Sequence, residues 1–463
     1  MSLSEKAIRR ASEVFAQAEL GDPRRVRRAV SLTEALASAP NQSLPKVWET
    51  DSELEAGYRF LRNTRNEFDA LMDPVQLQAR REAMRAKSIL VLHDTTDIEC
   101  TAAEPEEVGF LQTGKPGFYV HHSLAVTEGE TPLPMGILWS QLWGRAQRSK
   151  GRPYNLSGPA LAKLKERESD RWLEGMRESH LWTEECQQVV HVMDREADFF
   201  RVFELAEHLD SDFVIRLRHN RSVQEGRLAE AMAEMPIKVK RLVSLSSRKS
   251  KTMPRYTHMG RAARQAKLTV RCGTVELQPP THMKASSPVQ LQVLQVLEES
   301  PPDGEKPVSW VLATSLPLRT RIDVERVLDI YRARWIVEDF HKALKTGCMF
   351  EKRQLESFQS LTTLLAMCYP IACELLRVRT RARVPGIPAT EVLRPSMLAA
   401  LRAHPKARRI SDDASAEEAL AAIARLGGHL KHNGPPGWQT LAAGYSHMLA
   451  FEAGWLAAQS QNL

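Results

Sequence analysis

Cysteine is scarce in this chain, and the six that occur lie at positions 100, 186, 272, 348, 368 and 373 without any C-x-x-C pair. This spacing predicts neither a zinc site nor a disulfide framework, so we expect buried free thiols. An unbroken apolar run of about 18 residues, as a membrane span requires, is also missing. The N-terminal segment lacks an apolar signal core, and we therefore expect a cytoplasmic protein.

Positive and negative charges are nearly balanced. The net charge of +7 on 463 residues only slightly favours a polyanionic partner. The distribution of charge is more informative than its sum. Between Arg241 and Arg271 there are nine Lys or Arg and no Asp or Glu, and four arginines lie within residues 24–28. Such clusters suit a phosphate backbone. Each cluster alone could equally be a solvated basic face.

The N-terminal part of the chain has a helical pattern, and strand-like runs begin only after it. About the first 70 residues predict helices, with a helix start at Pro23 and a break between Pro40 and Pro45. Continuous apolar runs then end at Asp94 and Asp194, and both are typical of strands buried on two faces. A core sheet is therefore expected in the middle of the chain.

The second half of the chain changes pattern twice. Short strands are expected from Phe213 to Leu316, where β-forming residues alternate or cluster. A long helix is expected from about Asp323 to Thr346, followed by helical segments to the end. This order predicts an α/β core that contains a β-rich insertion.

Asp94 and Asp194 are each the first carboxylate after a buried run, which places each at the C-terminal end of the expected strand. Ligands of open α/β sheets collect at those ends. If the two strands are neighbours, both carboxylates point into one crevice, as a hard cation such as Mg²⁺ requires. Either aspartate alone could equally cap a helix or start a turn.

A third acid comes from the expected long helix. At about 100° per residue, one stripe of that helix holds five polar side chains, which are Tyr331, Arg334, Glu338, Lys342 and Lys345. The alternative is an exposed face on which Glu338 bonds Lys342 one turn later. A carboxylate that completes a metal site beside cations and a hydroxyl would suit a cleaved DNA end.

Other polar residues near these positions have different expected roles. We interpret three neighbouring acids as structural or supporting, namely Asp97, Asp198 and Asp339. His121 and His122 are adjacent on a strand and point to opposite faces, so they cannot easily share one ion. Thr96 stands where an aspartate-based phosphatase would carry its second Asp, which argues against that class.

The sequence resembles the DDE transposases of bacterial insertion sequences, in the class marked by Y-x2-R-x3-E-x6-K. Tyr331, Arg334, Glu338 and Lys345 match that signature in full. The flanking words DTT, DREAD and FHKALKTG match as well. The similarity extends from LGDPRR near the N-terminus through YRFLRN to AIARLGG, and so covers nearly the whole chain.

The resemblance implies a ribonuclease H-like α/β core, a mixed sheet flanked by helices, with a β-rich insertion and all-helical N- and C-terminal domains. It implies that Asp94, Asp194 and Glu338 bind two Mg²⁺ or Mn²⁺ ions per active site. The implied reaction is cut-and-paste transposition. One strand is nicked at each transposon end, the 3′-hydroxyl forms a hairpin, the hairpin is opened, and the same hydroxyl joins target DNA.

The resemblance also implies DNA contacts. Tyr331, Arg334 and Lys345 would hold phosphate beside a flipped base. Trp310 would stack on that base, although it could equally be a strand tryptophan that faces the core. Further expected DNA contacts, mostly to phosphates, are Lys342, Arg24, Arg25, Arg28, Arg59, Arg62, Arg216, Arg218 and His219.

The expected domains are a helical DNA-end-binding domain at 1–70, a catalytic domain at 71–375 with the insertion at about 212–318, and a helical dimerisation domain at 376–463. In the last, Trp438 and Trp455 bracket an Ala-rich stretch. The implied partners are double-stranded DNA, both transposon inverted-repeat ends and target, and a second copy of the chain that acts in trans. Two alternatives stay open, a non-catalytic end-binding repressor derived from a transposase and a metal-dependent nuclease without strand transfer.

Overall fold

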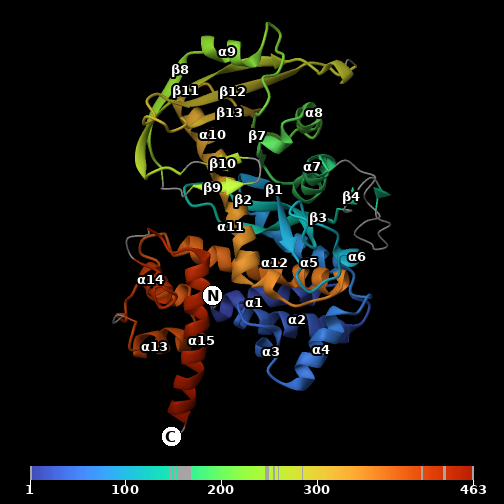
Figure 1. The fold of residues 1–463 in the computed structure, drawn as a ribbon, viewed down its shortest axis with the longest axis vertical. Coiled ribbons are helices and arrows are strands. Elements are labelled where there is room, and N and C mark those ends of the chain that lie inside the picture. Colours follow the sequence, from blue (N-terminus) through green and yellow to red (C-terminus); the bar gives the residue numbers. More distant parts are fainter. Residues whose placement is uncertain are drawn as a thin grey trace.

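The computed structural model describes residues 3–145, 148–149, 152–153, 168–245, 250–253, 256–258, 260–283, 285–407, 410–430 and 434–460. Figure 1 shows a central sheet, with N-terminal helices on one side of helix α12 (Phe358–Arg381) and C-terminal helices beside them. Within the basic segment of the sequence, Arg248, Lys249 and Arg255 lie outside the described residues.

The N-terminal region is helical, as expected, and the described residues 3–70 contain no strand. Its helices are α1 (Glu5–Glu13), α2 (Pro23–Ser38), α3 (Leu44–Val47), α4 (Asp51–Leu61) and α5 (Phe68–Ala83). The predicted start at Pro23 is confirmed, because Asp22 caps α2 by accepting from the Arg24 backbone N–H at 2.8 Å. Residue 70, the expected end of the N-terminal domain, lies within helix α5.

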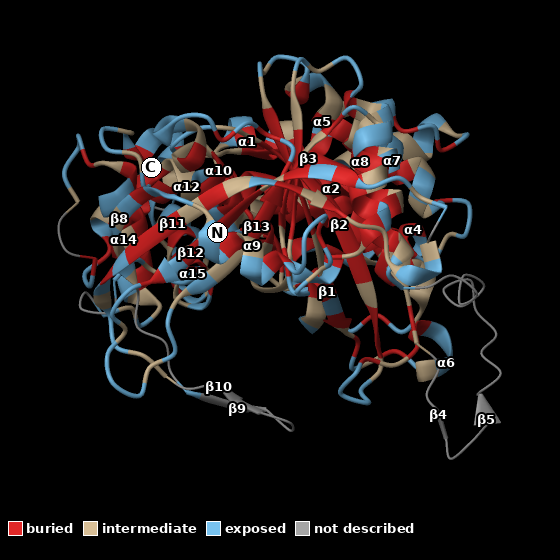
Figure 2. Cartoon of the chain, turned by 90° about the horizontal axis from the view of Figure 1, so that it is seen from above, coloured by how far each residue is buried: buried red, intermediate tan, exposed pale blue. Residues whose placement is uncertain are grey.

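Nine strands form one mixed sheet in the order β3-β2-β1-β6-β7-β13-β12-β11-β8. The expected central strands are β1 (Ile89–Glu99), β2 (Gly117–Thr127), β3 (Pro134–Trp143), β6 (Val189–Met193) and β7 (Asp212–Arg216). Strand β6 pairs in parallel with β1 and with β7, and the other neighbours are antiparallel. Figure 2 shows that these strands form the buried centre of the molecule.

The β-rich insertion extends the central sheet. Its long strands are β8 (Ile237–Leu245), β11 (Arg264–Leu277), β12 (Val289–Glu298) and β13 (Ser309–Thr314). Strand β13 pairs with β7 through Leu312 and Arg216, so the insertion and the core share one backbone ladder. The expectation of short strands was wrong for β11, which is 14 residues long because it pairs on both sides. Two short hairpins pair β4 (Arg148–Ser149) with β5 (Arg152–Pro153) and β9 (Lys251–Met253) with β10 (Tyr256–His258).

Helices cover the sheet and complete the C-terminal region. Those that flank the sheet are α6 (Pro105–Val108), α7 (Asp170–Thr183), α8 (Phe200–His208), α9 (Leu228–Glu234), α10 (Arg321–Ala333) and α11 (Trp335–Lys342). Those after α12 are α13 (Pro395–Ala403), α14 (Ala416–Leu426) and α15 (Trp438–Ser460). In the described part of the chain, α12 alone is long and apolar enough to cross a membrane, yet its apolar window is entirely buried inside the protein.

The expected long helix is interrupted at Arg334. Helix α10 ends at Ala333, α11 begins at Trp335, and a π-helical turn, Ala343–Gly347, follows. At the junction the Arg334 N–H bonds the Tyr331 carbonyl at 3.2 Å, three residues back, in a tighter turn than an α-helix makes. The regular wheel is therefore broken, and Tyr331 and Arg334 are buried while Lys342 is exposed.

Candidate active site

Asp94 lies in the middle of strand β1, so its expected place at a strand end was wrong. The strand continues to Glu99 because β2 pairs with it over its full length. The neighbour that ends beside Asp94 is parallel strand β6, whose last partner pair is Leu92 with Val192. The same register continued by two residues brings Asp94 level with Asp194. The two carboxylates therefore stand side by side, as the hypothesis of one crevice requires.

Asp194 begins the turn after β6. Its Oδ1 accepts the backbone N–H of Glu196 at 2.7 Å and so caps the 3-10 turn Arg195–Ala197. The alternative of a capping aspartate is thus also correct for this residue. Capping fixes the orientation of one carboxylate oxygen above the parallel strands.

Arg334 joins Asp94 to Glu338. Its Nη1 lies 3.3 Å from Asp94 Oδ2, and its Nη2 donates to Glu338 Oε1 at 2.7 Å. The side chains of Arg334, Asp94 and Glu338 are 9%, 18% and 29% exposed. The alternative in which Glu338 bonds Lys342 is wrong, since Lys342 lies 3.4 Å from Asp339 instead. Glu338 therefore faces the aspartates.

The carboxylates concentrate negative charge at this place. Burial raises the pKa of Asp94 to about 7, with further contributions from Asp194 and Glu338, although Arg334 acts in the opposite direction. Oxygen donors of this kind are those that Mg²⁺ and Mn²⁺ prefer. Among the described residues no three such side chains already stand as a metal-holding group. The donor set fits divalent cations in chemistry, and Arg334 must move for all three acids to reach one.

Tyr331 and Trp310 form an aromatic pair beside Arg334. Their ring centroids are 5.5 Å apart in an edge-to-face arrangement. Tyr331 is buried and bonded to Arg216, and burial raises the pKa of its hydroxyl. Trp310 is half-buried on β13 and packs against the core, so the interpretation as a strand tryptophan describes its present contacts. Arg216 also donates to the Ser309 carbonyl at 3.3 Å.

Lys345 lies on the π-helical turn and is 21% exposed. Its Nζ is 3.0 Å from Asp97 and 3.4 Å from Glu351. The Lys345 ammonium lowers the pKa of Asp97 against the opposing effect of burial. Asp97 is therefore held in an ion pair with this lysine. Lys342, at 57% exposed, points more freely to solvent.

The loop after β7 is held by Asp198. This buried carboxylate accepts the backbone N–H groups of Arg218 at 2.6 Å and His219 at 2.8 Å, and it bonds Arg221 at 2.7 Å. The side chains of Arg218 and His219 are exposed. Asp198 thus has a structural role that leaves both side chains on the surface.

The N-terminal basic residues lie on α2, α4 and the end of α4, beyond α12 from the sheet (Figure 1). Arg24, Arg28, Arg59 and Arg62 are exposed. Arg24 pairs with Asp22 at 3.2 Å, and Arg59 lies 3.6 Å from Glu55. Arg25 differs from the others because its Nη1 donates to the Arg65 carbonyl at 2.8 Å. Arg25 therefore joins two helical segments, and the structure does not bring this group to the carboxylates.

Part of the basic segment 241–271 is used within the fold. Arg241 lies 3.7 Å from Asp329, Arg264 pairs with Glu298 and Glu305, and Arg271 donates to the Met235 carbonyl at 2.7 Å. The segment is therefore less available to a polyanion than its composition indicates.

The two adjacent histidines face opposite sides of β2, as predicted. His121 Nδ1 is 2.9 Å from Thr95 Oγ1, whereas His122 lies 3.1 Å from His341 and 3.0 Å from the Tyr369 hydroxyl. Burial lowers the pKa of His122 to about 3. These rings are neutral, buried parts of the core on both faces of the sheet.

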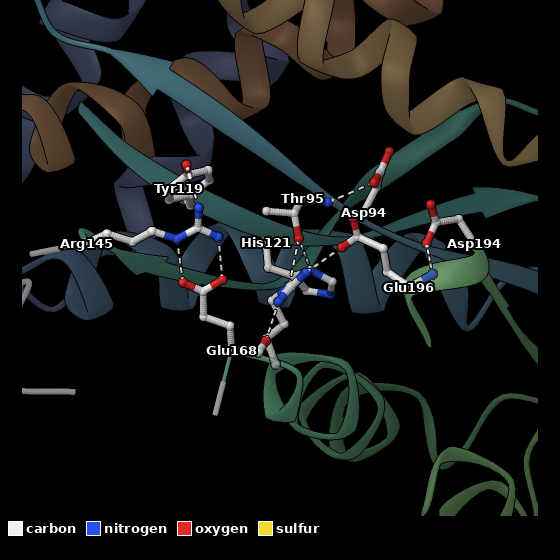
Figure 3. A network of polar contacts seen from close by, with 9 residues as sticks. Asp94, Thr95, Tyr119, His121, Arg145, Glu168, Asp194 and Glu196 are labelled. Atoms are coloured by element: carbon white, nitrogen blue, oxygen red, sulfur yellow. Dashed lines mark hydrogen bonds and ion pairs between the residues drawn. The ribbon is translucent and has the colours of Figure 1, made fainter. Parts of the chain in front are cut away.

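Sequence reasoning missed several residues at the site. The Trp335 indole is 56% exposed, and the Arg334 guanidinium lies 5.0 Å from its ring centroid. Thr95, Arg171 and Glu196 form a polar network between Asp94 and Asp194 (Figure 3). Their separation in sequence explains the omission, because no local pattern connects residues 95, 171 and 196.

The mixed sheet flanked by helices, with carboxylates above its parallel strands, is consistent with the ribonuclease H-like core that the sequence predicts. A transposase DNA-binding family model matches residues 10–66, and a transposase DDE domain model matches residues 171–372. The chain belongs to the DDE transposases. The second match contains Asp194 and Glu338, whereas Asp94 precedes it and is brought to them by the sheet.

Proposed function

We propose that this protein is a cut-and-paste DNA transposase of the Y-x2-R-x3-E-x6-K class, in which Asp94, Asp194 and Glu338 are the catalytic metal ligands. The observation that carries this proposal is the convergence of the three acids. One comes from β1, one from the turn after β6 and one from α11, and Arg334 bonds two of them. Burial raises the pKa of Asp94, and Asp194 and Glu338 add to this effect, so a bound cation would favour the ionised carboxylate.

Two bound Mg²⁺ or Mn²⁺ ions would stabilise the entering and leaving oxygens of an in-line phosphoryl displacement. The carboxylates supply the donor oxygens for them. Arg334, released from Asp94 and Glu338, can turn its planar fork to a phosphate. Lys345 and the Tyr331 hydroxyl would supply further phosphate contacts. In this proposal Trp310 separates from Tyr331 enough to stack on an extruded base.

The proposed sequence of steps is nicking, hairpin formation, hairpin opening and joining to target DNA. All four are phosphoryl transfers, so one set of ligands suffices. The presence of all three acids in the sequence speaks against the alternative of a non-catalytic repressor. The alternative of a nuclease without strand transfer differs only in its products.

The proposed partners are transposon ends, target DNA and a second copy of the chain. Residues 1–70 would bind the end through exposed Arg24, Arg28, Arg59 and Arg62, with 71–375 as the catalytic domain. Residues 376–463 would pair two subunits. Trp438 is only 4% exposed and lies under Arg379 of its own chain. The half-buried Trp455 and the 43% exposed Leu456, near the end of α15, are therefore the better contacts for a partner.

The test uses purified full-length protein, Mg²⁺ and a duplex that carries the inverted-repeat ends flanking its own gene. We expect nicked, hairpin and joined products on denaturing gels. Asp94→Ala and Glu338→Ala should abolish cleavage while gel-shift binding to the ends persists. Glu356→Ala, at an exposed position before α12, is the matched control. Undiminished cleavage by either active-site variant would contradict the site assignment.

A further inference from the structure

Arg171, in the first turn of α7, is a nearly buried cation that bonds two residues close in sequence to the aspartates, Thr95 and Glu196. Its side chain is 9% exposed, and its guanidinium carbon lies 5.3 and 5.5 Å from the ring centroids of Trp143 and Trp172. It also donates to the Glu168 carbonyl. Burial and contact with two aromatic rings limit the freedom of this planar group to move.

The Arg171 guanidinium reaches strand β1 and the turn that follows β6. Its Nε donates to Thr95 Oγ1 at 2.9 Å, and its Nη2 donates to Glu196 Oε2 at 2.7 Å. In Figure 3, Thr95 lies beside Asp94, and Glu196 lies beside Asp194.

Each of these two partners holds one catalytic carboxylate by its backbone. The Thr95 N–H donates to Asp94 Oδ1 at 2.9 Å, and the Glu196 N–H donates to Asp194 Oδ1 at 2.7 Å. A continuous polar path thus runs from one carboxylate to the other through a single guanidinium. Backbone pairing between β1 and β6 ends at Leu92 and Val192, two residues before the aspartates. The Arg171 path continues the connection where the ladder stops.

We propose that Arg171 is a positioning residue that sets the separation of Asp94 and Asp194 and thereby the affinity of the site for divalent cations. This inference rests on the proposed function, since it concerns the same metal site. Groups that orient metal ligands commonly change metal affinity by roughly 10- to 100-fold when they are removed. Arg171 touches neither carboxylate directly and acts through Thr95 and Glu196.

The sign of the effect separates positioning from simple electrostatics. Loss of a positive charge near a cation site should strengthen cation binding if charge alone matters. Loss of a positioning group should weaken binding because the two carboxylates no longer share one geometry. Arg171→Gln therefore gives opposite results under the two explanations.

The experiment is calorimetric titration of Mn²⁺ into the full-length protein without DNA, with thermal unfolding and gel-shift binding to transposon ends measured in parallel. We expect Arg171→Gln to weaken Mn²⁺ binding roughly 10-fold while end binding is unchanged. Arg171→Lys, which keeps the charge and loses the fork, should recover part of the affinity. Arg177→Gln, on the exposed face of the same helix, is the control and should match the wild type.

Thr95→Val and Glu196→Gln test the same inference even if Arg171→Gln does not fold. Each should weaken Mn²⁺ binding, and their effects should not add to that of Arg171→Gln in double variants, because all three break one path. Unchanged or tighter Mn²⁺ binding in Arg171→Gln, or unchanged binding in both neighbouring variants, would overturn the inference. If wild-type protein binds no Mn²⁺, or Asp94→Ala binds it equally well, the proposed function fails first.

Discussion

Arg334 Nη1 lies 3.3 Å from Asp94 Oδ2, although 240 residues separate the two in sequence. This contact places a fixed positive charge where the proposed cation must bind. Arg334 and the metal therefore compete for the same carboxylates. Arg171 differs from Arg334 because it bonds Thr95 and Glu196 and neither aspartate.

We expect Arg334→Gln to bind Mn²⁺ several-fold more tightly than the wild type and yet to cleave DNA at least 10-fold more slowly. Metal binding improves because a competing cation is removed, and cleavage falls because a bidentate phosphate contact is lost. Titration calorimetry and single-turnover cleavage measure the two effects separately. Weaker metal binding in this variant would show that Arg334 organises the ligands instead of competing for them.

Asp94→Asn should stabilise the metal-free protein at pH 8. The folded-state pKa of Asp94 is about 7, above its ordinary 3.8, so ionisation opposes folding increasingly as pH rises through this interval. The amide removes that penalty, and after loss of the Arg334 contact we expect a net gain of about 1 kcal/mol in the free energy of unfolding. Urea unfolding in EDTA is the measurement.

Asp339→Asn is the matched control for that prediction. Despite opposing burial, Arg379 lowers the pKa of Asp339, so its charge stabilises the fold above the ordinary pKa. This variant should be less stable than the wild type at pH 8. Destabilisation by Asp94→Asn of the same size would contradict the idea that the site holds excess negative charge.

The fold class and the two central strands could be predicted from the sequence. Two apolar runs ending at Asp94 and Asp194 indicated buried strands, and the structure adds that these strands, β1 and β6, are parallel neighbours. That Asp94 lies inside its strand could not be predicted, because β2 extends β1 through a long-range antiparallel ladder. The continuity of the insertion with the core sheet likewise depends on the pairing of β13 with β7.

The candidate site was predictable in its acids and less so in its contacts. An ideal helical wheel placed Glu338 correctly on the side of Arg334, but Lys342 is exposed and lies near Asp339 instead. Lys345, which pairs with Asp97, lies on the π-helical turn, and no residue pattern in the sequence predicts that turn. Arg171 could not be identified from the sequence because its partners, on β1 and after β6, are distant from it in the chain.

The buried histidines of the central sheet and of α11 should make stability strongly dependent on pH. Burial lowers the pKa of His122 and His191 to about 3, and it also lowers the pKa values of His93, His121 and His341. Below pH 6.5 these histidines bind protons in the unfolded chain but not in the folded chain. Each such histidine therefore removes about 1.4 kcal/mol of stability per pH unit below that value, until its folded pKa is reached.

Urea unfolding between pH 8 and pH 5 measures this dependence. We expect a plateau above about pH 7 and a steep decline below pH 6.5. His122→Phe should reduce the slope by about one proton, at some cost in overall stability because His341 and Tyr369 lose a partner. A stability that stays constant from pH 7 to pH 5 would mean that the buried rings are charged or solvated in the folded state.

The most direct test of the central claim exchanges a proposed metal ligand for a softer one. Asp94→Cys and Glu338→Cys should each lose cleavage of transposon-end DNA in Mg²⁺ and regain part of it in Mn²⁺, which accepts a thiolate ligand more readily. Glu356→Cys, away from the site, should cleave equally well in either metal. Full activity of Asp94→Cys or Glu338→Cys in Mg²⁺ would contradict the assignment of these carboxylates as metal ligands.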